Sequence, residues 1–108
     1  MAWFKVDDNL AFHPKAIMAG NPAMGLWVRA GSYVAQQLTD GFIPGDIARS
    51  LGTPAQAQRL VTAGLWLPCG SGYEFHQWTD RQPTRKDVEK RRAAGAERLR
   101  KWREQQDM

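Results

Sequence analysis

Four polar side chains between residues 56 and 62 have the types and the spacing that could read DNA. They lie on one side of a predicted helix over residues 54–63, whose opposite side is apolar. Amide, guanidinium and hydroxyl groups contact base edges or phosphates when such a helix enters a major groove. The four residues are Gln56, Gln58, Arg59 and Thr62. They include a single cation, and short helix pairs also occur in many proteins that never touch nucleic acid.

The helix that would position these side chains has clear start signals. Thr53 is its expected N-cap, and Gln56, three residues later, is the expected capping-box partner. A shorter helix opens at Pro44 and Gly45 and ends at Gly52, which we expect in the left-handed conformation. Two short helices joined by a tight turn and followed directly by a strand are typical of a helix-turn-helix that runs into a wing.

A long helix is predicted ahead of this pair. Apolar residues recur at steps of three and four from Asn21 to about Leu38, which predicts the backbone of the core. Gly25 and Gly31 on this helix have no capping role, so we expect them to permit close approach of a neighbouring helix. A short helix over residues 14–19 precedes it.

Strand signals flank the helix pair. Residues 42–43 predict a very short strand, and residues 65–69 and 73–78 predict a β-hairpin with a three-residue loop, which would be the wing. Residues 3–6 alternate weakly and fit either a short edge strand or an extended segment packed on the body. The order of elements predicts a mainly α-helical fold with a small β-hairpin. We therefore expect a winged helix-turn-helix over residues 1–83, followed by a basic C-terminal helical arm over residues 84–108.

Composition limits the classes of protein to consider. A length of 108 residues suits one domain, and an apolar fraction of 43% is typical of a chain with a core rather than of a disordered one. Cys69 is the single cysteine, which excludes a disulfide within the chain, and we expect it to be a small buried residue. No apolar run approaches the roughly 20 residues that span a bilayer, and the N-terminus does not fit a signal peptide. We therefore expect a cytoplasmic protein with no membrane partner, associated with the nucleoid if it is bound to DNA.

Positive charge is concentrated at the C-terminus. Residues 1–80 carry five Lys or Arg against six acids, whereas residues 81–108 carry ten against five. The segment 84–106 is helical by composition, with Thr84 and Asp87 as a cap, but its apolar positions are few. Such a helix is either an exposed arm, a dimerising arm or one that orders on a polyanion; a solvated charged face is the plain alternative. We also expect Glu97 to pair with Lys101 four residues later.

The sequence gives little support for a catalytic function. His13 and His76 lie far apart along the chain, and we expect His76 to be a strand residue of the wing beside aromatics. The loop Gly70 to Gly72 lacks the lysine and the following helix of a phosphate-binding loop. We therefore expect no enzyme activity, no cofactor and no metal.

Several short motifs, taken together, resemble the N-terminal winged-helix domain of phage replisome organisers, a family related to primosomal DnaD-like proteins. The motifs are Trp3-Phe4-Lys5, Gly25-Leu26-Trp27, Asp40-Gly41-Phe42-Ile43, Ala63-Gly64-Leu65, and Tyr73 to Trp78 followed by Gln82-Pro83. The likeness covers residues 3–83. It implies a phage or prophage protein of a high-GC host that acts at replication origins or as a small DNA-binding regulator. Family members usually continue into a further domain that engages DNA or the helicase-loading machinery, whereas this sequence continues into a basic helix.

The sequence therefore predicts double-stranded DNA as the partner of a homo-oligomer, together with a replication or host protein. The alternative is a protein interaction module that binds itself or a host protein and has only non-specific affinity for nucleic acid. The predicted DNA contacts are Arg49, Thr53, Gln56, Gln58, Arg59, Thr62, Arg81, Arg85, Lys86, Lys90, Arg91, Arg92, Arg98 and Lys101.

Overall fold

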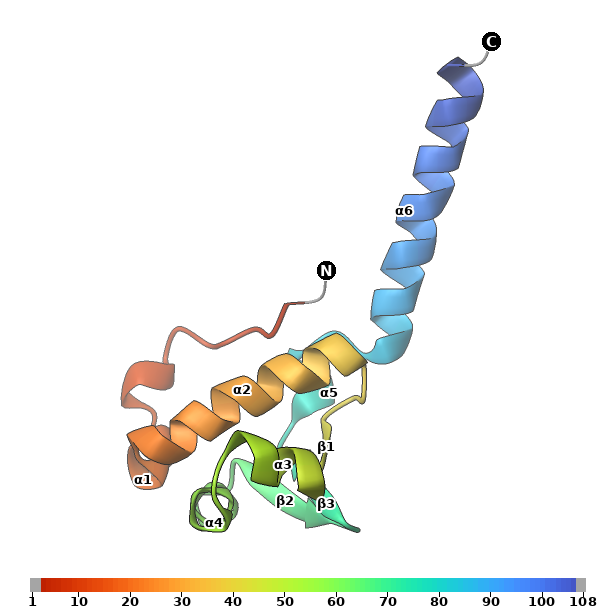
Figure 1. Cartoon of the computed structure of the whole chain (residues 1–108). Helices are drawn as coiled ribbons and strands as arrows, with labels where there is room; N and C mark the ends of the chain where they lie inside the picture. The colour runs from red at the N-terminus through yellow and green to blue at the C-terminus, as the bar shows by residue number, and fades with distance from the viewer. Residues whose placement is uncertain (1–2, 107–108) are drawn as a thin grey trace.

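Helices make up most of the chain and pack around one small antiparallel sheet (Figure 1). The computed structural model describes residues 3–106. Its elements in chain order are a 3₁₀ turn at Leu10–Phe12, α1 at Pro14–Ala19, α2 at Asn21–Gln37, β1 at Phe42–Pro44, α3 at Gly45–Leu51, α4 at Pro54–Thr62, β2 at Trp66–Cys69, β3 at Gly72–Phe75, α5 at Trp78–Arg81 and α6 at Arg85–Gln106. The prediction of a mainly helical fold with a small β element and a long C-terminal helix is confirmed.

The predicted long helix is α2, and it forms one wall of the core. Its apolar residues recur at steps of three and four, so they share one face, which packs against α1, α3 and α4. Leu38 ends the helix in the left-handed conformation, with φ 56°, and its N–H donates to the carbonyl of Val34. The largest fully buried side chains of the core are Trp66, Leu26, Ile43, Leu60 and Val34.

The glycines of α2 have a different role from the predicted one. A Cβ on Gly31 would overlap the ring of Phe4, so this glycine makes room for an aromatic side chain of the N-terminal segment rather than for a helix. Gly25 is exposed and has no atom within 4 Å of such a Cβ, so no neighbouring helix approaches it. Residues 3–6 are extended without forming a strand, and Gln82 holds them through two hydrogen bonds to the Lys5 backbone, of 2.9 and 2.6 Å.

The sheet has three strands in the order β1-β3-β2, with both pairings antiparallel. The predicted hairpin is present, but β3 ends at Phe75 rather than at Trp78, and two residues, Gly70 and Ser71, lie between its strands instead of three. Gln77 adopts a positive φ of 58° and turns the chain into α5, which buries Trp78. Consequently His76 lies beyond the strand in which we expected it, and Cys69 at the end of β2 is exposed rather than buried.

Caps were predicted at two residues of the turn between α3 and α4. The structure agrees with the prediction at Thr53, but Gly52 has a different conformation. Thr53 Oγ1 accepts from the N–H of Gln56, and the Gln56 side chain accepts from the N–H of Thr53, so the capping box is complete. Gly52 is extended, with φ −160°, and not left-handed as predicted. Its Cβ would lie 2.6 Å from Gln56 Oε1 and 3.0 Å from Leu26, so glycine is required here by lack of space.

Alanine substitutions at the two glycines of α2 should change the free energy of unfolding in opposite directions. Gly31→Ala should lower the free energy of unfolding by about 1–3 kcal/mol, because the methyl group would displace Phe4 from its aromatic neighbours. Gly25→Ala, the matched control on the same helix, should raise it by about 0.5–1 kcal/mol through helix propensity. Urea denaturation of both variants measures the difference. Equal effects would contradict the contact between Gly31 and Phe4.

A second substitution tests the capping box of α4. Thr53→Ala should lower the free energy of unfolding by about 1 kcal/mol, because the N–H of Gln56 would lose its acceptor. Thr53→Ser retains the hydroxyl and should stay close to the wild type. Thermal denaturation of the three proteins compares them, and a destabilisation with serine as large as with alanine would rule out the hydroxyl as the cause.

Candidate nucleic-acid interface

Three of the predicted contacts meet in a groove between the helix pair α3–α4 and the hairpin β2–β3. The groove has a volume of about 410 Å³, and Arg49, Thr53 and Gln58 line it together with the hairpin turn. Arg49 is exposed and lies in the last turn of α3, while Thr53 and Gln58 come from the N-terminal half of α4. The polar groups that could hold a phosphate or a base edge therefore converge here, but Arg49 is the single cation that lines the groove.

Other predicted contacts on α4 are bound within the chain. Gln56 completes the capping box, so its side-chain oxygen faces the backbone of Thr53. Arg59 Nε donates to the carbonyl of Ala19, the last residue of α1, at 3.3 Å. Thr62 accepts from the Gln58 amide at 3.4 Å. The structure thus assigns Gln56 to a helix cap and Arg59 to the contact between α4 and α1, and neither lines the groove.

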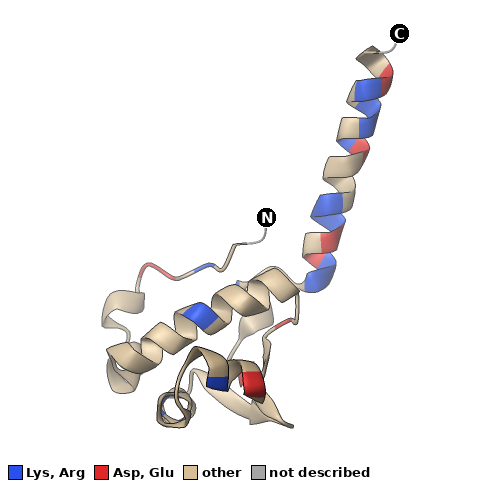
Figure 2. Ribbon diagram, in the orientation of Figure 1, with Lys and Arg blue, Asp and Glu red and all other residues tan. Residues whose placement is uncertain are grey.

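Most of the positive charge lies on α6, which projects from the body (Figure 2). Val88 is its only buried residue in the part of the helix that the structure describes. The helix begins at a complete cap, in which Thr84 Oγ1 accepts from the N–H of Asp87 and the Asp87 carboxylate accepts from the N–H of Thr84. This backbone hydrogen bond holds the pKa of the Asp87 carboxyl below its usual range. The Arg85 N–H donates to Asp40, so the first turn of α6 is fixed to the loop after α2.

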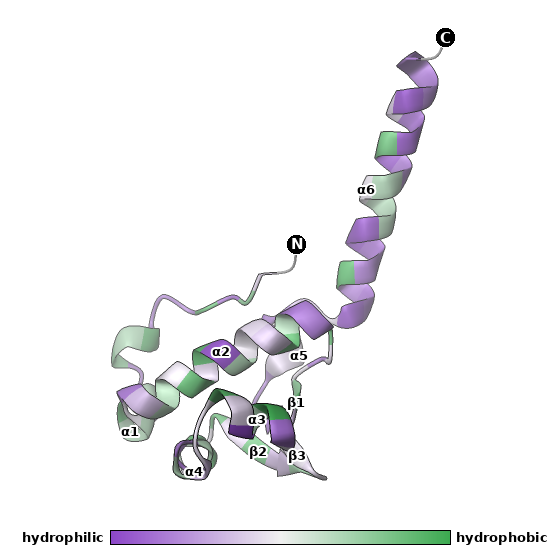
Figure 3. Ribbon diagram, viewed as in Figure 1, coloured by the Kyte–Doolittle hydropathy of each residue, from purple (hydrophilic) through white to green (hydrophobic). Residues whose placement is uncertain are grey.

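The acids of α6 pair with few of its cations. Glu89 pairs with Arg85, whereas Glu97 pairs with Arg100 and not with Lys101 as predicted; Glu104 also lies near Arg100. Seven further cations of α6 make no ion pair with any acid among residues 3–106; these are Lys86, Lys90, Arg91, Arg92, Arg98, Lys101 and Arg103. Hydropathy along α6 is correspondingly low, with isolated apolar positions (Figure 3). Two of these, Leu99 and Trp102, are 47% and 57% exposed.

The predicted contacts therefore fall on two separate surfaces. The groove is lined by α3, α4 and the hairpin turn. The helix α6 leads away from the body beyond the C-terminal end of α2 (Figure 1). The molecule measures 61 by 30 by 20 Å, and the arm accounts for its length. Arg81 belongs to neither surface, because its guanidinium pairs with Asp7 of the N-terminal segment at 3.1 Å.

A second hollow was not anticipated from the sequence. His13 and His76, which are distant along the chain, line the same cavity together with Lys15 and Arg81, and its volume is about 360 Å³. The N–H of Asn9 holds the pKa of the Asp7 carboxyl at the rim below its usual range, and Arg81 adds a smaller contribution. No spacing signal could have revealed this cavity, because its residues come from four regions of the chain. Within residues 3–106, no three His, Cys, Asp or Glu side chains are grouped so that they could hold a metal ion.

None of the helices in the described part of the chain combines the length and the apolar character needed to cross a membrane.

Comparison of the chain with models of protein families, with curated proteins and with solved structures gives no match. The resemblance to phage replisome organisers therefore remains a prediction from the residues quoted for it.

Proposed function

We propose that this chain is a winged-helix DNA-binding protein of phage or prophage type, in which the basic arm supplies most of the affinity. The observation that carries the proposal is the state of α6: it bears nine Lys and Arg between residues 85 and 103, while Val88 is its one buried residue in the described part. A long helix whose cations lack partners can follow a phosphate backbone and release its counterions.

The order of elements supports a winged-helix role for the body. A long helix, a short strand, two short helices and a hairpin follow one another, and the short strand pairs with the second strand of the hairpin. In such an arrangement α4 would enter the major groove and the turn between β2 and β3 would lie along the neighbouring phosphates. Arg49 and Gln58 line the groove between the helix pair and the hairpin turn. Among the predicted contacts on the body, these two are the best placed to touch DNA.

The body alone would bind DNA weakly and with little sequence preference. Residues 1–80 carry a net charge of −1, and Asp46 lies in the first turn of α3, three residues before Arg49. One small module reads few base pairs, so useful specificity would need two copies on a repeated or palindromic site. Action on DNA in replication initiation or regulation would place the protein in the cytoplasm of the host cell.

A second candidate function is suggested by an apolar corner beside α1. Phe12, Ile17 and Met18 are 86%, 65% and 57% exposed, which is unusual for three large apolar side chains so close in sequence. They favour an interaction module that binds a protein, with the arm giving non-specific affinity for nucleic acid. We rank DNA binding first because the arm offers more cations to a phosphate backbone than the corner offers apolar side chains to a protein.

The charge of the arm leads us to expect that affinity for duplex DNA depends on salt concentration. We expect the full chain to bind a mixed-sequence duplex in fluorescence anisotropy, with the logarithm of the association constant falling linearly with the logarithm of salt concentration. The fourfold variant Lys90→Gln, Arg91→Gln, Arg98→Gln, Lys101→Gln should flatten this slope by up to about 0.9 for each phosphate that it no longer neutralises. Arg100→Gln, which removes a cation already paired with Glu97, is the control and should change the slope little.

Arg49 tests whether the winged-helix surface also holds DNA. Arg49→Gln should weaken binding about threefold to tenfold at low salt, since the groove would no longer offer a cation to a phosphate or a base edge. Lys5→Gln, which removes a cation remote from the groove, controls for net charge. If the arm variant abolishes binding and Arg49→Gln has no effect in the full chain, the groove between α3–α4 and the hairpin does not hold DNA. If the full chain shows no binding at about 100 mM salt, the DNA-binding proposal fails and the protein-interaction candidate takes its place.

A further inference from the structure

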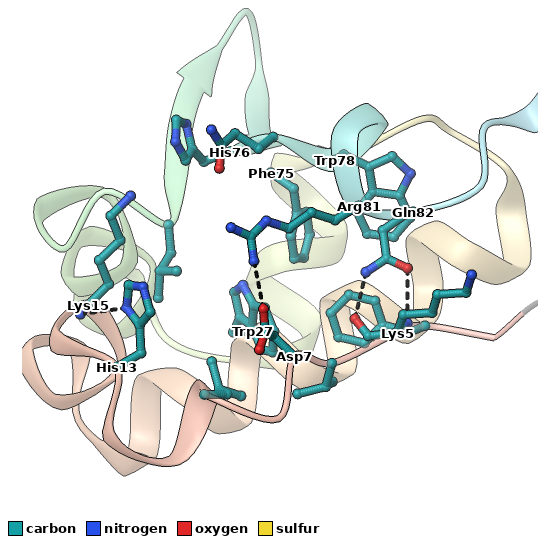
Figure 4. Close-up of a pocket in the computed structure, with 15 residues that line it drawn as sticks. Lys5, Asp7, His13, Lys15, Trp27, Phe75, His76, Trp78, Arg81 and Gln82 are labelled. Carbon is teal, nitrogen blue, oxygen red and sulfur yellow. Dashed lines mark hydrogen bonds and ion pairs between the residues drawn. The ribbon is translucent and has the colours of Figure 1, made fainter.

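The cavity between the N-terminal segment and the sheet has the features of a ligand site. Its volume of about 360 Å³ falls in the range of small-molecule pockets. Figure 4 shows the N-terminal segment along one side, α2 behind it, and the chain from β3 into α5 on the opposite side. It lies apart from both the α3–α4 groove and the basic arm, so it is not used by the proposed DNA contacts.

Four aromatic side chains form part of the wall of the cavity. Phe4, Trp27, Phe75 and Trp78 all line it, and they contact one another with ring centroids between 5.0 and 6.2 Å apart. These contacts fix the rings, so the apolar surface is formed before any ligand arrives. A flat or short aliphatic group could lie against it.

One donor in this wall lacks an acceptor. Trp27 is 9% exposed, and its indole Nε1 is buried with no hydrogen-bond partner among residues 3–106. A buried N–H of this kind normally finds an acceptor, because its loss of water is otherwise uncompensated. The nitrogen is covered by neighbouring side chains, so an acceptor reaches it only if these side chains shift.

The charges at the rim favour an anion. Lys5, Lys15 and Arg81 line the cavity, against the single carboxylate of Asp7. Arg81 is 59% exposed in its side chain and pairs with Asp7 at 3.1 Å, so its remaining N–H groups can turn to a second carboxylate. Lys15 Nζ makes one hydrogen bond, to the carbonyl of Gly64 at 3.4 Å, and keeps further donors.

We propose that this cavity binds a small amphipathic carboxylate, whose apolar part lies on the aromatic side chains and whose oxygens accept from the cations at the rim. The rim cations distinguish an acid from its neutral analogue, and the wall distinguishes an amphipathic acid from acetate. The proposal concerns a surface that DNA would not touch, so it stands or falls independently of the proposed function.

Nuclear magnetic resonance of the full ¹⁵N-labelled chain tests the site with 4-phenylbutyrate as the probe and 4-phenylbutyramide as its neutral control. Trp27→Phe assigns the Trp27 indole signal among those of the five tryptophans. We expect 4-phenylbutyrate to shift this signal saturably with a Kd of about 1 mM or below, since a ligand of this size gains limited free energy. The amide should bind about tenfold more weakly.

Two rim variants separate the site from general effects of charge. Arg81→Gln and Lys15→Gln should each weaken 4-phenylbutyrate about threefold to tenfold, whereas Arg91→Gln on the arm should leave its affinity unchanged. Lys15→Gln leaves the Asp7–Arg81 pair in place, so it remains informative if Arg81→Gln loosens the N-terminal segment. The proposal is overturned if the Trp27 signal does not move up to about 10 mM probe, which is tenfold above the expected Kd. Equal binding of acid and amide, or shifts confined to the apolar corner at Phe12, Ile17 and Met18, overturns it as well.

Discussion

The aromatic cluster around Phe4 is the contact on which the rest of the body depends. The Phe4 ring stacks on Trp78 at 5.7 Å and meets the edge of Trp27 at 5.0 Å, above the space left by Gly31. It joins the N-terminal segment, α2 and α5, which are distant in sequence. Each ring buries a large apolar area, and edge or offset contacts between rings add to that stabilisation. The same rings line the cavity, so one aromatic cluster both packs the body and forms part of the proposed ligand site.

Local signals in the sequence predicted the elements whose ends are set by neighbouring residues. Periodicity located α2, and the capping boxes at Thr53 and Thr84 located the starts of α4 and α6, because a cap is an interaction over three residues. Contacts between distant residues left no such signal. The room that Gly31 makes for Phe4 spans 27 positions, and the end of β3 is set by burial of Trp78 against Phe4 rather than by its own propensity. Gly52 is limited by both kinds of contact, since a Cβ there would meet Gln56 four residues later as well as Leu26 on α2.

The candidate DNA contacts were predicted by residue type, and the structure divides them by what else each side chain can bind. Gln56 and Arg59 have the chemistry to read bases, but each has a partner nearby: the N–H of Thr53 for Gln56 and the carbonyl of Ala19 for Arg59. A helical pattern reveals which side of a helix is polar, and it cannot reveal that another helix end approaches that side. Arg49 and Gln58 both line the groove that faces the hairpin turn, although the Gln58 amide also donates to Thr62 on the same helix.

The arm is better suited to a polyanion than to a second copy of itself. Residues 85–106 carry nine cations against four acids, and two parallel or antiparallel arms would bring like charges together along their whole length. Leu99 and Trp102 are too few to offset that repulsion by burial, since a helix dimer needs an apolar residue at nearly every turn of the contact face. Phosphates would relieve the repulsion among the arm's own cations, so the proposed contact with DNA would also stabilise the helical order of α6. Self-association of this chain would therefore arise on the body, where the exposed apolar corner beside α1 lies, and leave the arms apart.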